Sequence, residues 1–173
     1  MLNDRIASAY YTTKTNANLL DTFKAVEQGY LGYFEDIKPK FYYAPALPLG
    51  TRFFNISDTT VLPSVEIAYG YQGLAPSTVT DMVREGAKGI VLAGMGAGGW
   101  TNPGTTAVNE AAGNGTFIVY SRRTQDGTVE ATSSNMTIGG GLLNPQKARI
   151  LLQLCINAGY SMASTKSVFE FDA

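Results

Sequence analysis

The sequence contains no histidine and a single cysteine among its 173 residues. The absence of histidine excludes a serine–histidine triad, a cysteine–histidine pair and a histidine metal site, and one cysteine cannot form an internal disulfide. Cys155 lies in an apolar stretch with helical spacing, which predicts an unreactive thiol in the core.

Net charge and long apolar runs are also scarce. The formal charge is −1 and the basic residues are not clustered, so neither nucleic acid nor an anionic membrane surface is an expected partner. No apolar run approaches the roughly 18 residues of a membrane-spanning helix. Three N-glycosylation sequons, which begin at Asn55, Asn114 and Asn135, would suit a secreted protein.

From Pro63 onward, strand and helix patterns alternate. Strands are predicted over 65–69, 88–93, 116–121 and, for a short fourth, 137–142. Helices are predicted after Ser77, over 105–112, from Asn144-Pro145 to the stop at Gly159, and over 164–169. This order predicts a small α/β domain with a Rossmann-like, mainly parallel sheet.

The stretch before Pro63 is less regular and rich in aromatic residues. Its spacing predicts a short helix over 19–26 and a hairpin or irregular strands between Gly32 and Tyr43. Pro45, Pro48 and Gly50 break regular structure, and the segment 45–63 is the best candidate for a domain boundary.

A glycine-rich loop, Gly94–Gly99, follows the apolar strand that ends near Ala93. Its G-x-G-x-x-G spacing allows a dinucleotide site, in which Arg122 and Arg123 would accept the 2′-phosphate of NADP. Residues 100–103 separate the loop from the expected helix, which favours a packing or subunit-contact role instead.

Several polar residues have two interpretations. Arg122 and Arg123 could clamp a carboxylate, but one buried ion-pair partner and one solvated charge is the commoner arrangement. Lys14 between threonines allows a nucleophile–base pair. Glu66 is expected to be half of an ion pair, and Glu130 to be a solvated loop residue.

Five segments together resemble the type II L-asparaginases, in particular the secreted fungal enzymes. The resemblance follows the order of that family with similar spacings and covers nearly the whole chain. The segments are TTKTNANLLDTF (12–23), GYLGY (29–33), AKGIVLAGMGAGG (87–99), SRRTQDG (121–127) and LLNPQKARILLQL (142–154).

The resemblance implies that the chain corresponds to the second half of the family. Residues 1–62 would be the tail of the larger N-terminal α/β domain plus the linker, and residues 63–173 the small C-terminal domain. The GGTI-type and GTDT-type threonine motifs of the family are absent, so Met1 is interpreted as an internal methionine, a gene-model start or a cloning boundary. The intact enzyme would hydrolyse L-asparagine through a threonine nucleophile, without metal or organic cofactor, and the chain alone is expected to be inactive.

In this family the C-terminal domain contributes to the active site of a neighbouring subunit, so the resemblance implies a homo-oligomer, a tetramer, that is extracellular or in the cell wall. An asparagine or serine after the glycine loop and a glutamate contact the substrate's α-amino end. Gly99 stands at the first position. Ser133-Ser134 stand at the second, with Glu130 slightly earlier. The alternatives are a non-catalytic ligand-binding or subunit-binding domain and an NADP-binding half-domain.

Overall fold

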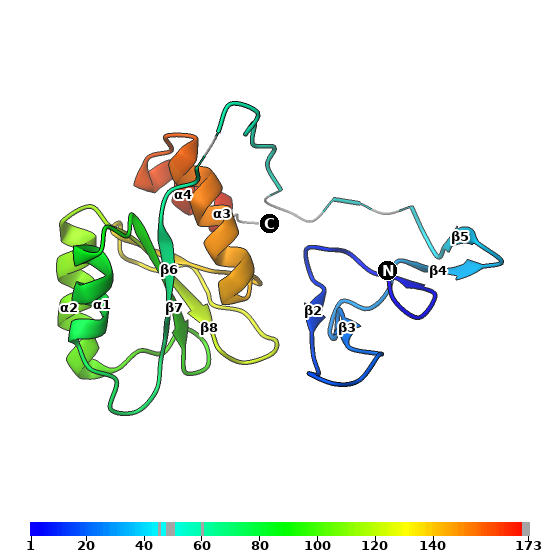
Figure 1. The fold of residues 1–173 in the computed structure, drawn as a ribbon, viewed down its shortest axis with the longest axis horizontal. Helices are drawn as coiled ribbons and strands as arrows, with labels where there is room; N and C mark the ends of the chain where they lie inside the picture. The colour runs from blue at the N-terminus through cyan, green and yellow to red at the C-terminus, as the bar shows by residue number, and fades with distance from the viewer. Residues whose placement is uncertain (45, 48–50, 60, 171–173) are drawn as a thin grey trace. The chain divides into compact units, whose positions relative to one another are not determined.

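The computed structural model describes residues 1–44, 46–47, 51–59 and 61–170, which divide into two units. Unit 1 covers Met1–Pro48 and unit 2 covers Leu49–Ala173 (Figure 1). The predicted chain breakers Pro45, Pro48 and Gly50 lie outside the described residues.

Unit 1 consists of short antiparallel strands with few buried side chains. Ala25 is the one buried hydrophobic residue among those described in this unit, so its apolar core is minimal. The predicted hairpin is confirmed, because β4 pairs antiparallel with β5. The sheets are β1-β4-β5, from β1 (Arg5–Ile6), β4 (Gly32–Glu35) and β5 (Lys38–Phe41), and β2-β3, from β2 (Thr13–Lys14) and β3 (Phe23–Lys24).

The predicted helix over 19–26 is wrong. The side-chain Oδ1 of Asn16 accepts hydrogen bonds from the backbone N–H groups of Asn18 (2.8 Å) and Leu19 (3.0 Å), so the chain turns there. The N–H of Thr15 then donates to the carbonyl of Thr22 at 2.8 Å and extends the β2–β3 pairing. An asparagine side chain that bonds its own neighbouring backbone competes with a helix, and a helix this short has little intrinsic stability.

Unit 2 contains a four-stranded parallel sheet in the order β6-β7-β8-β9, which confirms the predicted α/β class (Figure 1). Every residue of β7 is buried, as expected for a central strand covered on both faces. The strands are β6 (Val65–Tyr69), β7 (Gly89–Gly94), β8 (Phe117–Arg122) and β9 (Thr137–Gly139).

Two helices cover each face of this sheet. In Figure 1, α1 and α2 lie on one face and α3 and α4 on the other. Ile90 and Leu92 of β7 join a buried cluster with Val108 of α2. On the opposite face a Cβ at Gly89 would lie 2.6 Å from Leu152, so the glycine lets the third helix approach closely. The helices are α1 (Ser77–Arg84), α2 (Asn102–Gly113), α3 (Pro145–Asn157) and α4 (Met162–Phe169).

The helix α2 begins three residues earlier than the predicted start at Thr105. Thr101 caps it, because its Oγ1 accepts a hydrogen bond from the N–H of Gly104, and Pro103 fits the first turn, where no N–H is needed. The cap predicted for α3 is confirmed, since the side chain of Asn144 accepts from the N–H of Lys147 at 3.0 Å.

The segment before β6 packs on α3 and the turn after it. The rings of Phe54 and Tyr160 lie 5.7 Å apart, and Asn157 donates to the hydroxyl of Thr59 at 3.0 Å. The side chain of Gln153 donates to the carbonyl of Pro63 at 2.9 Å. Residues 51–59 and 61–63 are therefore part of the packing of unit 2.

Candidate functional site

The glycine loop (residues 94–99) folds tightly on itself at the carboxyl end of β7. The N–H of Met95 donates to the carbonyl of Gly99 at 2.8 Å, and the N–H of Gly98 donates to Gly96 at the same distance. Gly96 and Gly98 have positive φ angles of 98° and 79°, which glycine adopts without strain. A Cβ at Gly94 would lie 2.7 Å from the Gly99 carbonyl oxygen, so the loop closes over Gly94 itself.

This closure argues against the dinucleotide interpretation. A pyrophosphate site needs backbone N–H groups that point at the ligand. Here the N–H groups of Met95, Gly96 and Gly98 all bond carbonyl oxygens within the loop. The helix that follows begins only after the Thr101 cap.

Arg122 and Arg123 follow β8 and have different environments. Arg122 is buried, donates to the carbonyl of Leu142 at 3.1 Å and lies 3.7 Å from the carboxylate of Asp126, as expected for the buried member. Arg123 is exposed, but it donates to the carbonyl of Gly70 at 2.7 Å and lies over the ring of Tyr69. The two guanidinium groups thus serve separate contacts in the fold instead of one clamp.

The segment Thr128–Thr132, which we call the wall segment, crosses the carboxyl edge of the sheet beside the glycine loop. Val129 is buried, and its backbone exchanges hydrogen bonds with Gly141 at 3.0 and 2.9 Å. A Cβ at Gly98 would lie 2.8 Å from the side chain of Val129, which shows how closely the glycine loop packs on the wall segment.

A hollow of about 400 Å³ lies between the glycine loop and the wall segment. Burial raises the pKa of Tyr120, one of its lining residues. A second hollow, of about 260 Å³, is also lined by the wall segment and by Glu170. The first hollow is lined by Ala97, Gly98, Tyr120, Thr128, Val129, Glu130 and Thr132.

The structure brings the two predicted site residues to neighbouring elements. Glu130 is exposed and lines the first hollow, while Gly99 is exposed at the end of the adjacent glycine loop. A Cβ at Gly99 would lie 3.1 Å from the carbonyl oxygen of Met95, so the asparagine or serine of the family pattern would need a small shift there. Their role in substrate binding remains a prediction.

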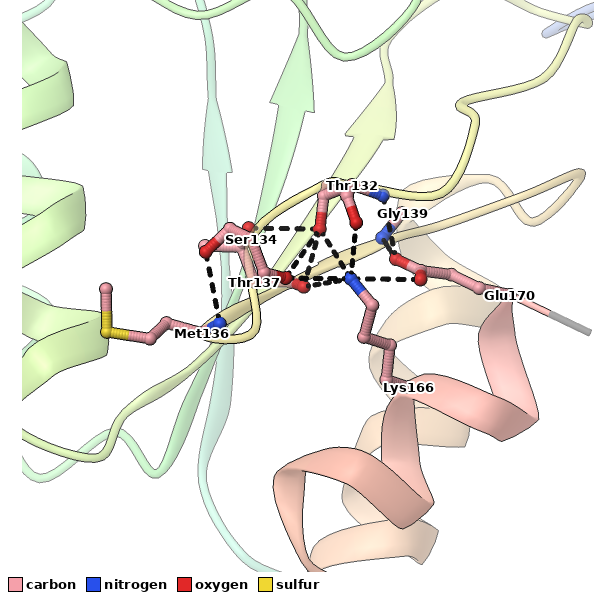
Figure 2. Close-up of polar contacts among 7 residues, drawn as sticks. All are labelled: Thr132, Ser134, Met136, Thr137, Gly139, Lys166 and Glu170. Atoms are coloured by element: carbon pink, nitrogen blue, oxygen red, sulfur yellow. Dashed lines mark hydrogen bonds and ion pairs between the residues drawn. The ribbon is translucent and has the colours of Figure 1, made fainter.

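A polar cluster on α4 was missed by the reasoning from sequence (Figure 2). Lys166 reaches from α4 to the loop after the wall segment, and its ammonium group lies 3.0 Å from the carboxylate of Glu170. The N–H groups of Thr132 (3.1 Å) and Gly139 donate to the other oxygen of the same carboxylate. The i, i+4 spacing of Lys166 and Glu170 indicates an ion pair on a helix, but it does not indicate which other residues the pair contacts.

The remaining candidates lie away from this edge or are inert. Cys155 is fully buried in α3, and burial raises the pKa of its thiol to about 11, as the predicted unreactive thiol requires. Glu66 is exposed and accepts a hydrogen bond from Ser64 at 2.9 Å, and within the described residues it has no ion pair, so that expectation is wrong. Lys14 lies exposed in β2 of unit 1.

Over the described ranges, no group of three or more acidic or cysteine side chains is placed to hold a metal ion. None of the helices in that part of the chain is both long and apolar enough to span a membrane.

Comparison with known protein families identifies the family to which this chain belongs. The model of the glutaminase/asparaginase C-terminal domain matches residues 64–169, and that of the asparaginase N-terminal domain matches residues 1–47. The chain belongs to the asparaginase family and contains its C-terminal portion.

Individual relatives agree with this assignment. The chain is 55% identical to L-asparaginase 2-3 of Saccharomyces cerevisiae and 50% identical to probable L-asparaginase 1 of Schizosaccharomyces pombe, over 98% and 99% of this chain and 48% of each relative. It is 33% identical to L-asparaginase 2 of Escherichia coli over 98% of this chain and 51% of that protein. The chain therefore spans about half the length of these relatives.

A solved structure has the same fold. The crystal structure of a probable cytoplasmic L-asparaginase from Campylobacter jejuni matches with a TM-score of 0.89 and 32% identity. The match covers 97% of this chain and 53% of that one.

Proposed function

We propose that this chain is part of an amidohydrolase that converts L-asparagine and water to L-aspartate and ammonia. The chain would supply the contacts to the α-amino end of the substrate. The observation that carries this proposal is the position of Glu130, a residue with a side-chain carboxylate that lines the hollow beside the glycine loop. No ion pair or hydrogen bond engages this carboxylate within the described residues, so it is available to a ligand.

A carboxylate in an open hollow suits a primary ammonium group. Hydrogen bonds between ions of opposite charge are shorter and about twice as strong as neutral ones. Gly99 has no side chain to add, so the chain would bind through Glu130 and through Thr128, which line the same hollow.

The nucleophile would come from outside this chain. Neither threonine motif of the family occurs in the sequence, and the relatives are about twice as long. We propose that the N-terminal half of the intact enzyme, in a neighbouring subunit of a homo-oligomer that is a tetramer by family resemblance, completes the site without metal or organic cofactor.

An extracellular or cell-wall location is also proposed. The three asparagines of the sequons, Asn55, Asn114 and Asn135, are all exposed, as glycan attachment requires.

Joining the chain to a relative tests the activity. The part of S. cerevisiae L-asparaginase 2-3 that this chain does not match would be fused before Met1, and ammonia release from L-asparagine measured for the fusion and for the chain alone. We expect the fusion to turn over and the chain alone to be silent, because the nucleophile is absent from it. A folded fusion without activity would refute the proposed function.

A further inference from the structure

We propose that Lys166 of α4 and Glu170, the C-cap residue of that helix, are positioning residues that fix the wall segment and thereby hold Glu130 in its hollow. The proposal rests on the proposed function for the role of Glu130, but the positioning itself is a property of this chain and is tested without turnover.

The ammonium group of Lys166 is surrounded by oxygen atoms of one loop (Figure 2). It donates to the carbonyl and hydroxyl oxygens of Thr132 at 2.6 and 2.8 Å. It also donates to the carbonyl oxygens of Ser134 at 2.8 Å and Thr137 at 3.1 Å. Together with the Glu170 carboxylate, these are five oxygen contacts for three N–H protons, so the protons are shared among the acceptors. The single ammonium group therefore holds several parts of the loop together.

The carboxylate of Glu170 binds backbone N–H groups at the two ends of the same loop. It accepts from Thr132 and from Gly139 of β9, so it ties the end of the wall segment to the sheet. The side chain of Glu170 is only 5% exposed and that of Lys166 is 22% exposed. Removing one partner would leave the other charge partly buried and uncompensated, which is more costly than losing a surface pair.

Glu130 lies between two fixed points of the wall segment. On one side, Val129 exchanges two backbone hydrogen bonds with Gly141. On the other, Thr132 has its N–H, carbonyl and hydroxyl groups all bonded to Lys166 or Glu170. Because the segment 128–131 lines hollows with both the glycine loop and α4, it depends on these end points for its position.

Hydrogen exchange of the full chain tests the positioning. In Glu170→Gln and Lys166→Cys we expect the amides of Thr132 and Gly139 to exchange about tenfold faster or more. The first variant removes the charge of the carboxylate that accepts from these amides, and the second removes the ammonium group that holds the loop, so the loop should open more often in both. The amides of Val129 and Gly141 should change much less, since their mutual hydrogen bonds remain. The control is Arg84→Gln, which removes the exposed ion pair with Asp81 on α1 and should leave exchange in the wall segment unchanged.

Chemical rescue separates positioning from general stability. Alkylation of Lys166→Cys with 2-bromoethylamine forms a carbon–sulfur bond, expels bromide and restores an ammonium group at nearly the length of lysine. Cys155 is fully buried with a thiol pKa of about 11, so it stays unmodified in the folded chain. We expect the rescue to restore slow exchange at Thr132 and Gly139.

The hydrogen-exchange results can either support or overturn the positioning role. Faster exchange confined to the wall segment and β9, reversed by aminoethylation, supports the positioning role. Unchanged exchange there, or an equal acceleration throughout the sheet, overturns it. If Lys166→Cys does not fold, Glu170→Gln alone decides.

The active fusion gives a second readout. There Glu170→Gln should raise the KM for L-asparagine about tenfold while kcat changes less than about twofold, as expected when the binding contact made by Glu130 is displaced. A fusion that is inactive as wild type contradicts the proposed function, while the exchange result still decides the positioning.

Discussion

The backbone of Glu130 runs directly against Gly139, so closely that a Cβ at position 139 would overlap the Glu130 carbonyl oxygen. The absence of a side chain on β9 therefore sets how near the wall segment lies to the sheet. Glycine at this position is explained by the close approach, since its φ angle is not positive.

Gly139→Ala is expected to displace the wall segment and destabilise unit 2. Overpacking of this kind costs about 1–3 kcal/mol, because the backbone of Glu130 has to move. Denaturant unfolding of wild type and variant measures the loss.

Gly113→Ala is the matched control. Gly113 ends α2, and a Cβ there would meet no atom within 4 Å. Alanine in a helix is favoured over glycine by up to about 1 kcal/mol, so the control should be neutral or slightly more stable. Equal stabilities of the two variants would show that the approach of Glu130 to Gly139 imposes no constraint.

Cys155 makes the stability fall at high pH. Burial raises its thiol pKa from 9.0 to about 11, so between these values the unfolded chain loses the proton while the folded chain keeps it. Unfolding then releases a proton, and the free energy of unfolding should fall by about 1.4 kcal/mol per pH unit in that window. Other groups titrate there too, so the measured quantity is the difference in slope between wild type and Cys155→Ala, and equal slopes would contradict the assignment.

Much of the fold of unit 2 could be predicted from local signals. The continuous apolar run of β7 has the composition of a strand covered on both faces, and Asn144-Pro145 marks the start of α3 by its capping chemistry. The predictions were wrong where a side-chain hydrogen bond, which the hydrophobic pattern does not show, determines the local backbone structure. Thr101 starts α2 early, and Asn16 turns the chain where a helix was predicted.

The site was predictable only in part. The glycine loop and Glu130 were found because family resemblance and strand order put them at the same edge. Lys166 and Glu170 were not, because an i, i+4 pair on a helix is usually a solvated contact. Its burial against Thr132 depends on the path of a long loop that no local pattern specifies.

Unit boundaries give a further prediction. We propose the C-terminal domain as residues 63–173, but Phe54 and Thr59 contact Tyr160 and Asn157. A fragment that begins at Leu49 should therefore melt a few degrees above one that begins at Pro63, since 1 kcal/mol shifts the Tm by about 4–8 °C in domains of roughly 60–100 residues and by about 2–4 °C in domains of roughly 150–250. Thermal melts of the two fragments make the comparison. Equal melting temperatures would show that residues 51–63 add no stability.

Glu130 is the residue on which the functional proposal depends most, and Glu130→Gln in the active fusion tests it directly. Losing a charged hydrogen-bond partner of the substrate should lower kcat/KM for L-asparagine by about 10- to 100-fold, mainly through KM. Glu85→Gln, at an exposed carboxylate after α1, is the control and should leave both constants unchanged. If Glu130→Gln retains the wild-type kcat/KM, the hollow beside the glycine loop does not bind the substrate's α-amino group.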